Sequence, residues 1–168
     1  MNNSTTNFTI DRENKKTKIE KEFSSPKEHV WAAWTEAELL DQWWAPKPWK
    51  SKTKAMDFSE GGRRLYAMVS PEGEEHWSLA DYMSITPKMS IKFRDGFCDS
   101  QGNINEDLPR SDWSVNFIET NGSTLVDIEI SYKTLADLEQ MTEMGFREGF
   151  TATLEDLAEI LLPSIRNR

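Results

Sequence analysis

The sequence predicts one α+β domain in which a curved antiparallel sheet is combined with two short helices and a long C-terminal helix. Apolar residues alternate with period two from about residue 50 to 132, as in strands that bury one face. Two helix-start patterns precede this region, and a helical pattern over residues 134–162 follows it. The 168 residues are enough for one domain. We expect a disordered tail over residues 1–15 and a single domain over residues 16–168.

Composition excludes several classes of function. The net charge of −9, from 20 basic and 29 acidic residues, disfavours binding to nucleic acid or to an anionic membrane surface. One cysteine and two histidines supply neither a disulfide framework nor a His/Cys zinc cluster, so we expect no metal and no cofactor. The N-terminus has no signal-peptide pattern and no apolar run is long enough to span a membrane, which predicts a cytoplasmic protein.

The first elements are a strand over residues 16–24 and two short helices. Ser25 is expected to cap the first helix, with Glu28 closing a capping box. Thr35 repeats the pattern for the second helix, which Pro46 ends because proline cannot continue a helix.

The sheet follows, with strands expected over residues 54–58, 64–69, 76–85, 89–93, 113–117 and 124–132. Asn121-Gly122 is a strong signal for a tight hairpin between the last two strands. Residues 98–110 form a long polar loop, which is either a solvated insertion or a lid over a site.

The last element is predicted as one helix over residues 134–162, capped by Thr134 and ended by Pro163. Gly145 and Gly149 lie inside it, and each costs about 1 kcal/mol relative to alanine. Such a cost is tolerated where two backbones approach closely. We therefore expect Gly149 at the closest approach to the sheet, where Gly149→Leu would overpack the contact.

Five sequence pieces, in this order and spacing, resemble the START-like (SRPBCC, helix-grip or Bet v 1-like) superfamily. Within it, residues 16–162 are similar to the C-terminal domain of the activator of heat-shock-protein-ninety ATPase. The pieces are Ser25-Pro26 to Trp34-Thr35, Leu39-Leu40 to Trp43-Trp44-Ala45-Pro46, Asp57 to Gly62, Tyr82 to Pro87, and Gly145 to Gly149-Phe150. The resemblance implies a sheet that grips the last helix around a cavity. Members include lipid carriers, polyketide cyclases and co-chaperone domains, so it implies no single activity.

Seven tryptophans raise the aromatic content to 11%, which fits either a core of large rings or an aromatic-lined cavity. For a cavity, its mouth is expected near residues 43–49 and 98–110. The candidate wall residues, which also include two polar side chains, are Trp31, Trp44, Met56, Tyr66, His76, Trp77, Asp81, Met89, Ile91, Trp113, Phe117, Met141, Met144 and Phe150.

Polar side chains leave several alternatives open. Asp81 shares strand parity with apolar residues, so it either faces the cavity or is turned outward by a bulge. Arg63 and Arg64 are either surface charges or ligands for a carboxylate. Asp57 is expected to support the turn at Gly61-Gly62. Cys98 has no neighbouring histidine, so no catalytic nucleophile is predicted.

Three functions are consistent with these observations. The first is binding of a small apolar or amphipathic molecule without transforming it. The second is a protein-interaction module of the co-chaperone type. The third is a cyclase- or hydrolase-like enzyme that uses His76, Asp81 or Tyr82 in the same cavity.

Overall fold

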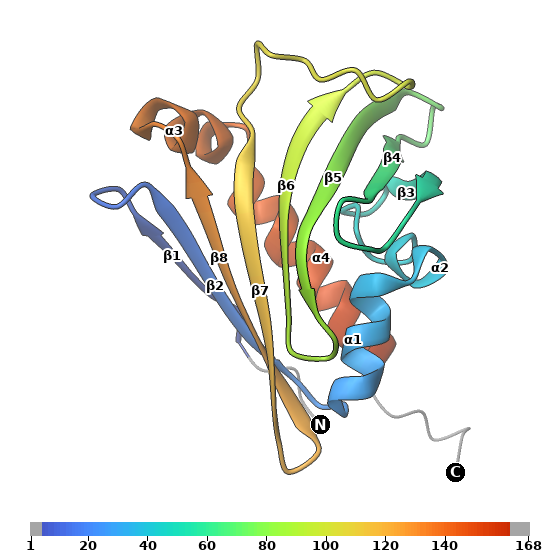
Figure 1. Ribbon diagram of the computed structural model, residues 1–168, viewed down its shortest axis with the longest axis vertical. Helices are drawn as coiled ribbons and strands as arrows, with labels where there is room; N and C mark the ends of the chain where they lie inside the picture. The colour runs from blue at the N-terminus through green and yellow to red at the C-terminus, as the bar shows by residue number, and fades with distance from the viewer. Residues whose placement is uncertain (1–4, 162–168) are drawn as a thin grey trace.

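The computed structural model describes residues 5–161 and confirms the helix-grip α+β fold (Figure 1). The strands form one antiparallel sheet in the order β1-β2-β8-β7-β6-β5-β4-β3, so the sheet is open, with β1 and β3 at its edges. In chain order the elements are β1 (Asn7–Asp11), β2 (Lys16–Phe23), α1 (Lys27–Thr35), α2 (Ala37–Leu40), β3 (Lys50–Met56), β4 (Arg63–Val69), β5 (Glu75–Thr86), β6 (Ser90–Cys98), β7 (Ser111–Thr120), β8 (Ser123–Tyr132), α3 (Leu135–Glu143) and α4 (Phe146–Leu161).

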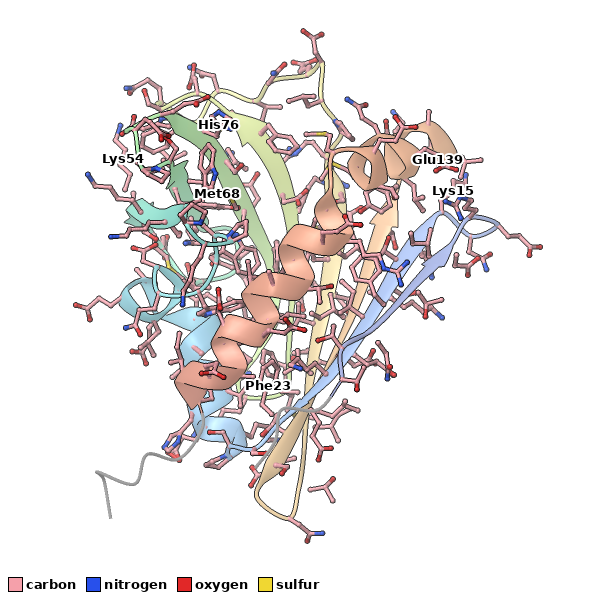
Figure 2. All side chains as sticks on the ribbon, turned by 180° about the vertical axis from the view of Figure 1, so that it is seen from behind. Lys15, Phe23, Lys54, Met68, His76 and Glu139 are labelled. Carbon is pink, nitrogen blue, oxygen red and sulfur yellow. The ribbon has the colours of Figure 1, made fainter. Side chains whose placement is uncertain are left out.

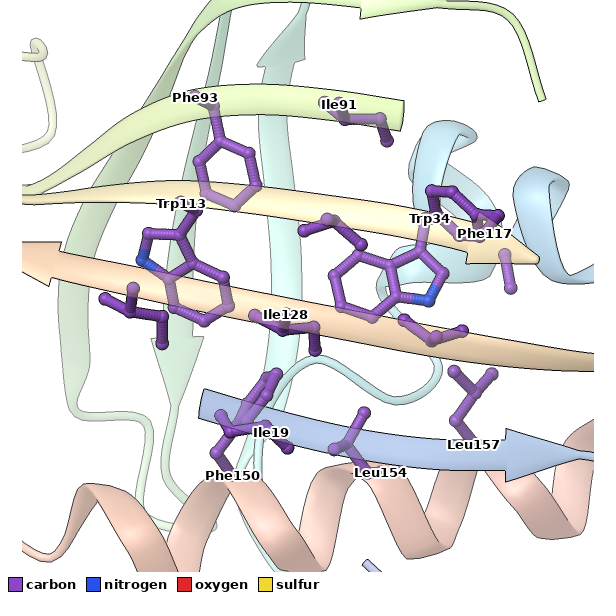
Figure 3. Packing of buried hydrophobic residues seen from close by; sticks show 14 of the residues in the cluster. Ile19, Trp34, Ile91, Phe93, Trp113, Phe117, Ile128, Phe150, Leu154 and Leu157 are labelled. Carbon is purple, nitrogen blue, oxygen red and sulfur yellow. The ribbon is translucent and has the colours of Figure 1, made fainter. Parts of the chain in front are cut away.

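The core lies between one face of the sheet and the helices α1, α2 and α4, and α4 crosses that face (Figure 2). Leu154 and Leu157 on α4 are fully buried, as are Ile19 on β2 and Ile130 on β8. Figure 3 shows side chains from these elements packed in one continuous layer. Each such side chain stabilises the fold by roughly 1.5–3 kcal/mol relative to an exposed position.

The N-terminal segment differs from the expected disordered tail. Residues 7–11 form β1, which pairs antiparallel with β2 and adds an edge strand to the sheet. Phe8 and Ile10 pack against the core from this strand. The prediction was wrong here because a short strand between polar residues carries little local signal and is stabilised by pairing with β2. Residues 1–4 of the expected tail lie outside the described residues.

The helix-start predictions were correct to within one residue in position but wrong in the capping interactions. Pro26 is the N-cap of α1, without a side-chain bond, and the carbonyl of buried Ser25 instead accepts a hydrogen bond from Thr124 Oγ1 at 2.8 Å. The Thr35 hydroxyl donates to the carbonyl of Trp31 at 2.9 Å rather than capping α2. Neither helix has a side-chain cap, and α2 ends at Leu40 rather than at Pro46 as expected.

The predicted long C-terminal helix is two helices. Thr134 caps α3 as expected, accepting a bond from the Asp137 amide at 3.0 Å. The helix then breaks at Gly145, whose φ of +89° is a left-handed conformation that favours glycine. The helical period continues across the break, which is why the sequence pattern did not show it. Pro163 lies outside the described residues.

Gly149 is not at the closest approach of α4 to the sheet. A Cβ atom built there would meet only Pro46 Cγ, at 3.8 Å, and nothing closer. The side chains that pack against the sheet follow it on α4, among them Leu154 and Leu157. The overpacking expected for Gly149→Leu is therefore wrong.

Turn predictions agree well with the structure. Asn121 and Gly122 both have positive φ, 54° and 83°, as a type I′ hairpin requires. Asp57 accepts a hydrogen bond from Ser59 Oγ at 2.8 Å, and a Cβ on Gly62 would lie 2.8 Å from Asp57 Cγ. Asp57 thus supports the turn before β4, as expected.

Edge strand β3 carries lysine at alternate positions. Lys50, Lys52 and Lys54 are exposed, whereas Ser51 is buried and Thr53 is half-buried.

Within the described residues, no helix is long and apolar enough to cross a membrane.

Candidate functional site

A cavity of about 320 Å³ lies between the sheet and the junction of α3 with α4. Inward-facing residues of β4 to β7 form one wall, and the helices and the segment after α2 form the other. On neighbouring strands, Met68 and His76 lie side by side (Figure 2). The lining residues are Trp44, Pro46, Tyr66, Met68, His76, Ser78, Asp95, Gly96, Phe97, Trp113, Met141, Met144, Gly145, Phe146, Gly149, Phe150 and Thr153.

Aromatic rings give this cavity a rigid apolar wall. The ring of Trp113 lies 5.3 Å from that of Phe150 and 5.9 Å from that of Trp44, measured between centroids. Trp44 Nε1 donates a hydrogen bond to the Tyr66 hydroxyl at 2.9 Å, which fixes both rings. Phe146 stacks on Phe150 at 5.3 Å. The rings support one another, so the wall is formed before any ligand enters.

Asp95 supplies a carboxylate to this largely apolar wall. Its Oδ1 accepts bonds from the Ser111 amide at 2.9 Å and the Ser111 hydroxyl at 2.7 Å, and its Oδ2 accepts from Trp113 Nε1 at 3.0 Å. Burial raises the pKa of Asp95, and the bonds from Ser111 and Trp113 oppose that rise. Asp95 is not among the predicted site residues, because the strand expected over residues 89–93 ends before it. Its parity with Ile91 and Phe93 was the signal that could have identified it.

Arg64 lies behind the wall, not in the cavity. Its guanidinium carbon is 4.0 Å from the centroid of the Tyr66 ring, and its Nη2 is 3.2 Å from Asp41 Oδ1. Burial lowers the pKa of Arg64, while Tyr66 and Asp41 oppose the shift. The alternative that Arg64 binds a ligand carboxylate is therefore wrong. Arg63 is also paired with a carboxylate of the protein, with its Nε 2.6 Å from Asp81 Oδ1.

A second, much smaller space of about 30 Å³ continues inward from this wall. It shares Trp44, Tyr66 and Asp95 with the larger cavity and also borders Arg64 and Tyr82. Burial raises the pKa of Tyr82 to about 12, so its hydroxyl stays protonated at neutral pH. A space of this size accommodates a water molecule but not a ligand.

The structure brings only part of the predicted wall together. Trp44, Tyr66, His76, Trp113, Met141, Met144 and Phe150 line the cavity. Trp31 and Phe117 instead pack on each other in the core at 5.2 Å, and Ile91 is 1% exposed. Met56 lies against the core from β3, and Met89 is exposed at a turn. The residue type, aromatic or methionine, was not enough to distinguish the side chains that line the cavity from those that pack in the core.

Trp77 and Asp81 lie on the opposite face of β5 from the cavity, so placing them in its wall was wrong. Asp81 pairs with Arg63 at 2.6 Å and with Arg110 at 2.9 Å, and its hydrogen bonds to these two arginines hold the pKa of its carboxyl below the usual value despite burial. Trp77 lies under Lys54 Nζ, 5.7 Å from the ring centroid. Both faces of β5 are partly covered, so alternation along the strand did not identify the inner face.

The loop over residues 98–110 is not a lid on the cavity. The Asn105 amide donates to the Phe97 carbonyl at 2.8 Å, and Arg110 Nε donates to the Asp95 carbonyl at 2.9 Å. A Cβ on Gly96 would lie 2.8 Å from Ile104 Cδ1, so the loop packs against the face of β6 opposite the Asp95 side chain. The cavity is bordered instead by the segment after α2 and by the α3–α4 junction.

The remaining polar groups give little support for catalysis. His76 is largely exposed and lies 2.7 Å from Glu74 Oε2, beside the Trp49 ring. Burial raises the pKa of the Cys98 thiol, which disfavours the reactive thiolate. Among the residues that the structure describes, no group of three or more His, Cys, Asp or Glu side chains could hold a metal ion. The arrangement is suited to holding an apolar molecule with one polar end.

Comparison with known proteins identifies the family. The chain is 27% identical to a Mycobacterium smegmatis protein of known crystal structure, with a TM-score of 0.87 over 96% of this chain and 99% of that one. It is 25% identical to an Arthrobacter aurescens protein solved by NMR, with a TM-score of 0.89 over 94% and 92% of the two chains. None of the curated proteins compared with it matches. Residues 24–162 match the family model described as activator of Hsp90 ATPase homolog 1-like protein, and the chain therefore belongs to that family.

Proposed function

We propose that this protein binds a small apolar or amphipathic molecule in the cavity between the sheet and the α3–α4 junction, without transforming it. The observation that carries the proposal is the cavity itself. Its volume of about 320 Å³ is at the lower end of the range of small-molecule sites, and its wall combines aromatic rings with Met68, Met141 and Met144. Methionine side chains adapt to ligands of different shape. We also propose that the protein binds this molecule in the cytoplasm.

The test is binding of phenylbutanol, a neutral apolar probe. Trp44 and Trp113 line the cavity, so a bound probe is expected to change tryptophan fluorescence. A ligand at a hundredfold excess over its Kd stabilises the folded state by about 2.7 kcal/mol, which also raises Tm.

Gly149→Leu provides the blocking variant, because Gly149 lines the cavity and a Cβ there meets no close neighbour. We expect it to weaken binding by roughly tenfold, about 1.4 kcal/mol. Glu148→Leu is the matched control, since Glu148 is the exposed neighbour on the same helix. Equal binding by both variants, or no binding by the unmodified protein, would contradict the proposal.

The family description favours a second function, binding to a chaperone-type protein partner. Exposed Met83, Met89 and Ile118 are apolar side chains that a partner could cover. This function predicts that Met89→Ser weakens partner binding, whereas Gly149→Leu leaves it unchanged.

A further inference from the structure

We propose that the cavity selects apolar amines, with the ligand's ammonium group bound to Asp95 and its apolar body held against the aromatic wall. This inference rests on the proposed function and names the ligand class for the same site. It follows from the charges that face the cavity, from the unused hydrogen-bonding capacity of Asp95, and from the rings beside it.

The charged and titratable groups of the cavity wall favour a cation. The titratable lining residues among those described are Tyr66, His76 and Asp95, and none of the lining residues is Lys or Arg. Asp95 is half-buried and hydrogen-bonded within the wall, whereas His76 is largely exposed and lies 2.7 Å from Glu74 Oε2. A carboxylate ligand would therefore bring a second negative charge toward Asp95, with no basic side chain in the wall to offset it.

Asp95 has room for one more donor. A carboxylate offers about four acceptor positions, and three are occupied here by the Ser111 amide, the Ser111 hydroxyl and Trp113 Nε1. Two of these bonds go to Oδ1 and one to Oδ2, which leaves an acceptor position on Oδ2. The nearby Arg110 is directed elsewhere, with Nε on the Asp95 carbonyl and Nη2 on Asp81.

The rings beside Asp95 also suit an ammonium group. Trp44, Tyr66 and Trp113 all border the cavity, and aromatic faces attract cations when water is excluded. Arg64 already lies over Tyr66, at 4.0 Å from the ring centroid, and its charge is paired with Asp41. The charge of Arg110 acts on Asp95 from outside the wall and lowers its pKa, so an ammonium at Asp95 Oδ2 would add a counter-charge that the cavity wall itself does not supply.

The test compares three probes that share a phenylbutyl body: phenylbutylamine, phenylbutanol and phenylvalerate. Titrations monitored by tryptophan fluorescence and by calorimetry at neutral pH give the three values of Kd. Because a charge-assisted hydrogen bond is stronger than a neutral one, we expect the amine to bind on the order of tenfold more tightly than the alcohol. The carboxylate is expected to bind more weakly than the alcohol.

The variant Asp95→Asn tests whether Asp95 causes the tighter binding of the amine. It is expected to remove the tenfold advantage of the amine while retaining binding of the alcohol. Asp112→Asn is the matched control, because it removes the same charge from an exposed pair with Arg94. Circular dichroism shows whether each variant is folded. If Asp95→Asn does not fold, the order of the three Kd values for the unmodified protein still tests the amine preference.

The outcomes separate this inference from the proposed function. If the alcohol binds and the amine binds no more tightly, the cavity binds small molecules but the amine preference is wrong. An amine preference that survives in folded Asp95→Asn also overturns the inference. If none of the three probes binds, small-molecule binding in this cavity fails together with it.

Discussion

Gly149→Leu is expected to stabilise the ligand-free protein, the opposite of what close packing of Gly149 on the sheet would give. Glycine inside a helix costs about 1 kcal/mol relative to alanine, and leucine is a good helix former. The new side chain meets only Pro46 Cγ, at 3.8 Å, and partly fills the cavity. Each methylene that it buries contributes up to about 0.8 kcal/mol. The free energy of unfolding should therefore rise by roughly 1–2 kcal/mol.

Urea denaturation and thermal melts measure this change. For a chain of this size, a gain of 1 kcal/mol raises Tm by about 2–4 °C. Gly145→Leu is the control, because its φ of +89° imposes strain of about 1–2 kcal/mol on any residue with a Cβ, so that variant should be less stable. Destabilisation of Gly149→Leu by about 1–3 kcal/mol would refute the reasoning, because that is the cost of overpacking a close contact.

Three further changes test other parts of the structure. Gly62→Ala should lower the free energy of unfolding by roughly 1–3 kcal/mol in urea denaturation, because its Cβ would lie 2.8 Å from Asp57 Cγ; an unchanged midpoint would contradict this. Arg64→Met should cost roughly 2–3 kcal/mol in the same assay, less than for a fully buried pair because Asp41 stays partly exposed; a neutral effect would show that the pair does not stabilise the fold. The pKa of Asp95 in the folded protein is raised above its usual 3.8. Its ionisation therefore lowers the free energy of unfolding as pH rises from 3.8 toward the pKa of the folded state. Melts at a series of pH values should show Asp95→Asn gaining stability relative to the unmodified protein as pH rises above about 3.8, and a shift in the other direction would be inconsistent with a buried carboxylate.

The sequence predicted those parts of the fold that depend on local chemistry. Asn121-Gly122 specified the hairpin between β7 and β8, because its positive φ values are costly for most other residues. Thr134 likewise marked the start of α3 correctly. Strand β1 was missed because its stability comes from pairing with β2 rather than from its own residues.

The site was harder to predict because it depends on which face of each strand turns inward. Leu79 is fully buried although it lies on the outer face of β5. Trp77 and Asp81 share that face with apolar Leu79, so the sequence pattern wrongly indicated that they point inward. Asp95 was missed for a related reason, since a charged residue before glycine has the appearance of a turn. In the structure β6 continues to Cys98 and stays paired with β5, so Asp95 keeps the inward parity of Ile91 and Phe93.

The lysines along β3 have a consequence for the behaviour of the protein at high concentration. An edge strand presents unpaired backbone groups that a second molecule could use to extend the sheet. Two copies that met along β3 would bring their rows of Lys50, Lys52 and Lys54 together, and the repulsion between ammonium groups would oppose the pairing. The charge pattern of this strand therefore disfavours extension of the sheet at its β3 edge and favours colloidal stability. Replacing these lysines with threonine should leave the monomer folded but make concentrated solutions more prone to precipitation.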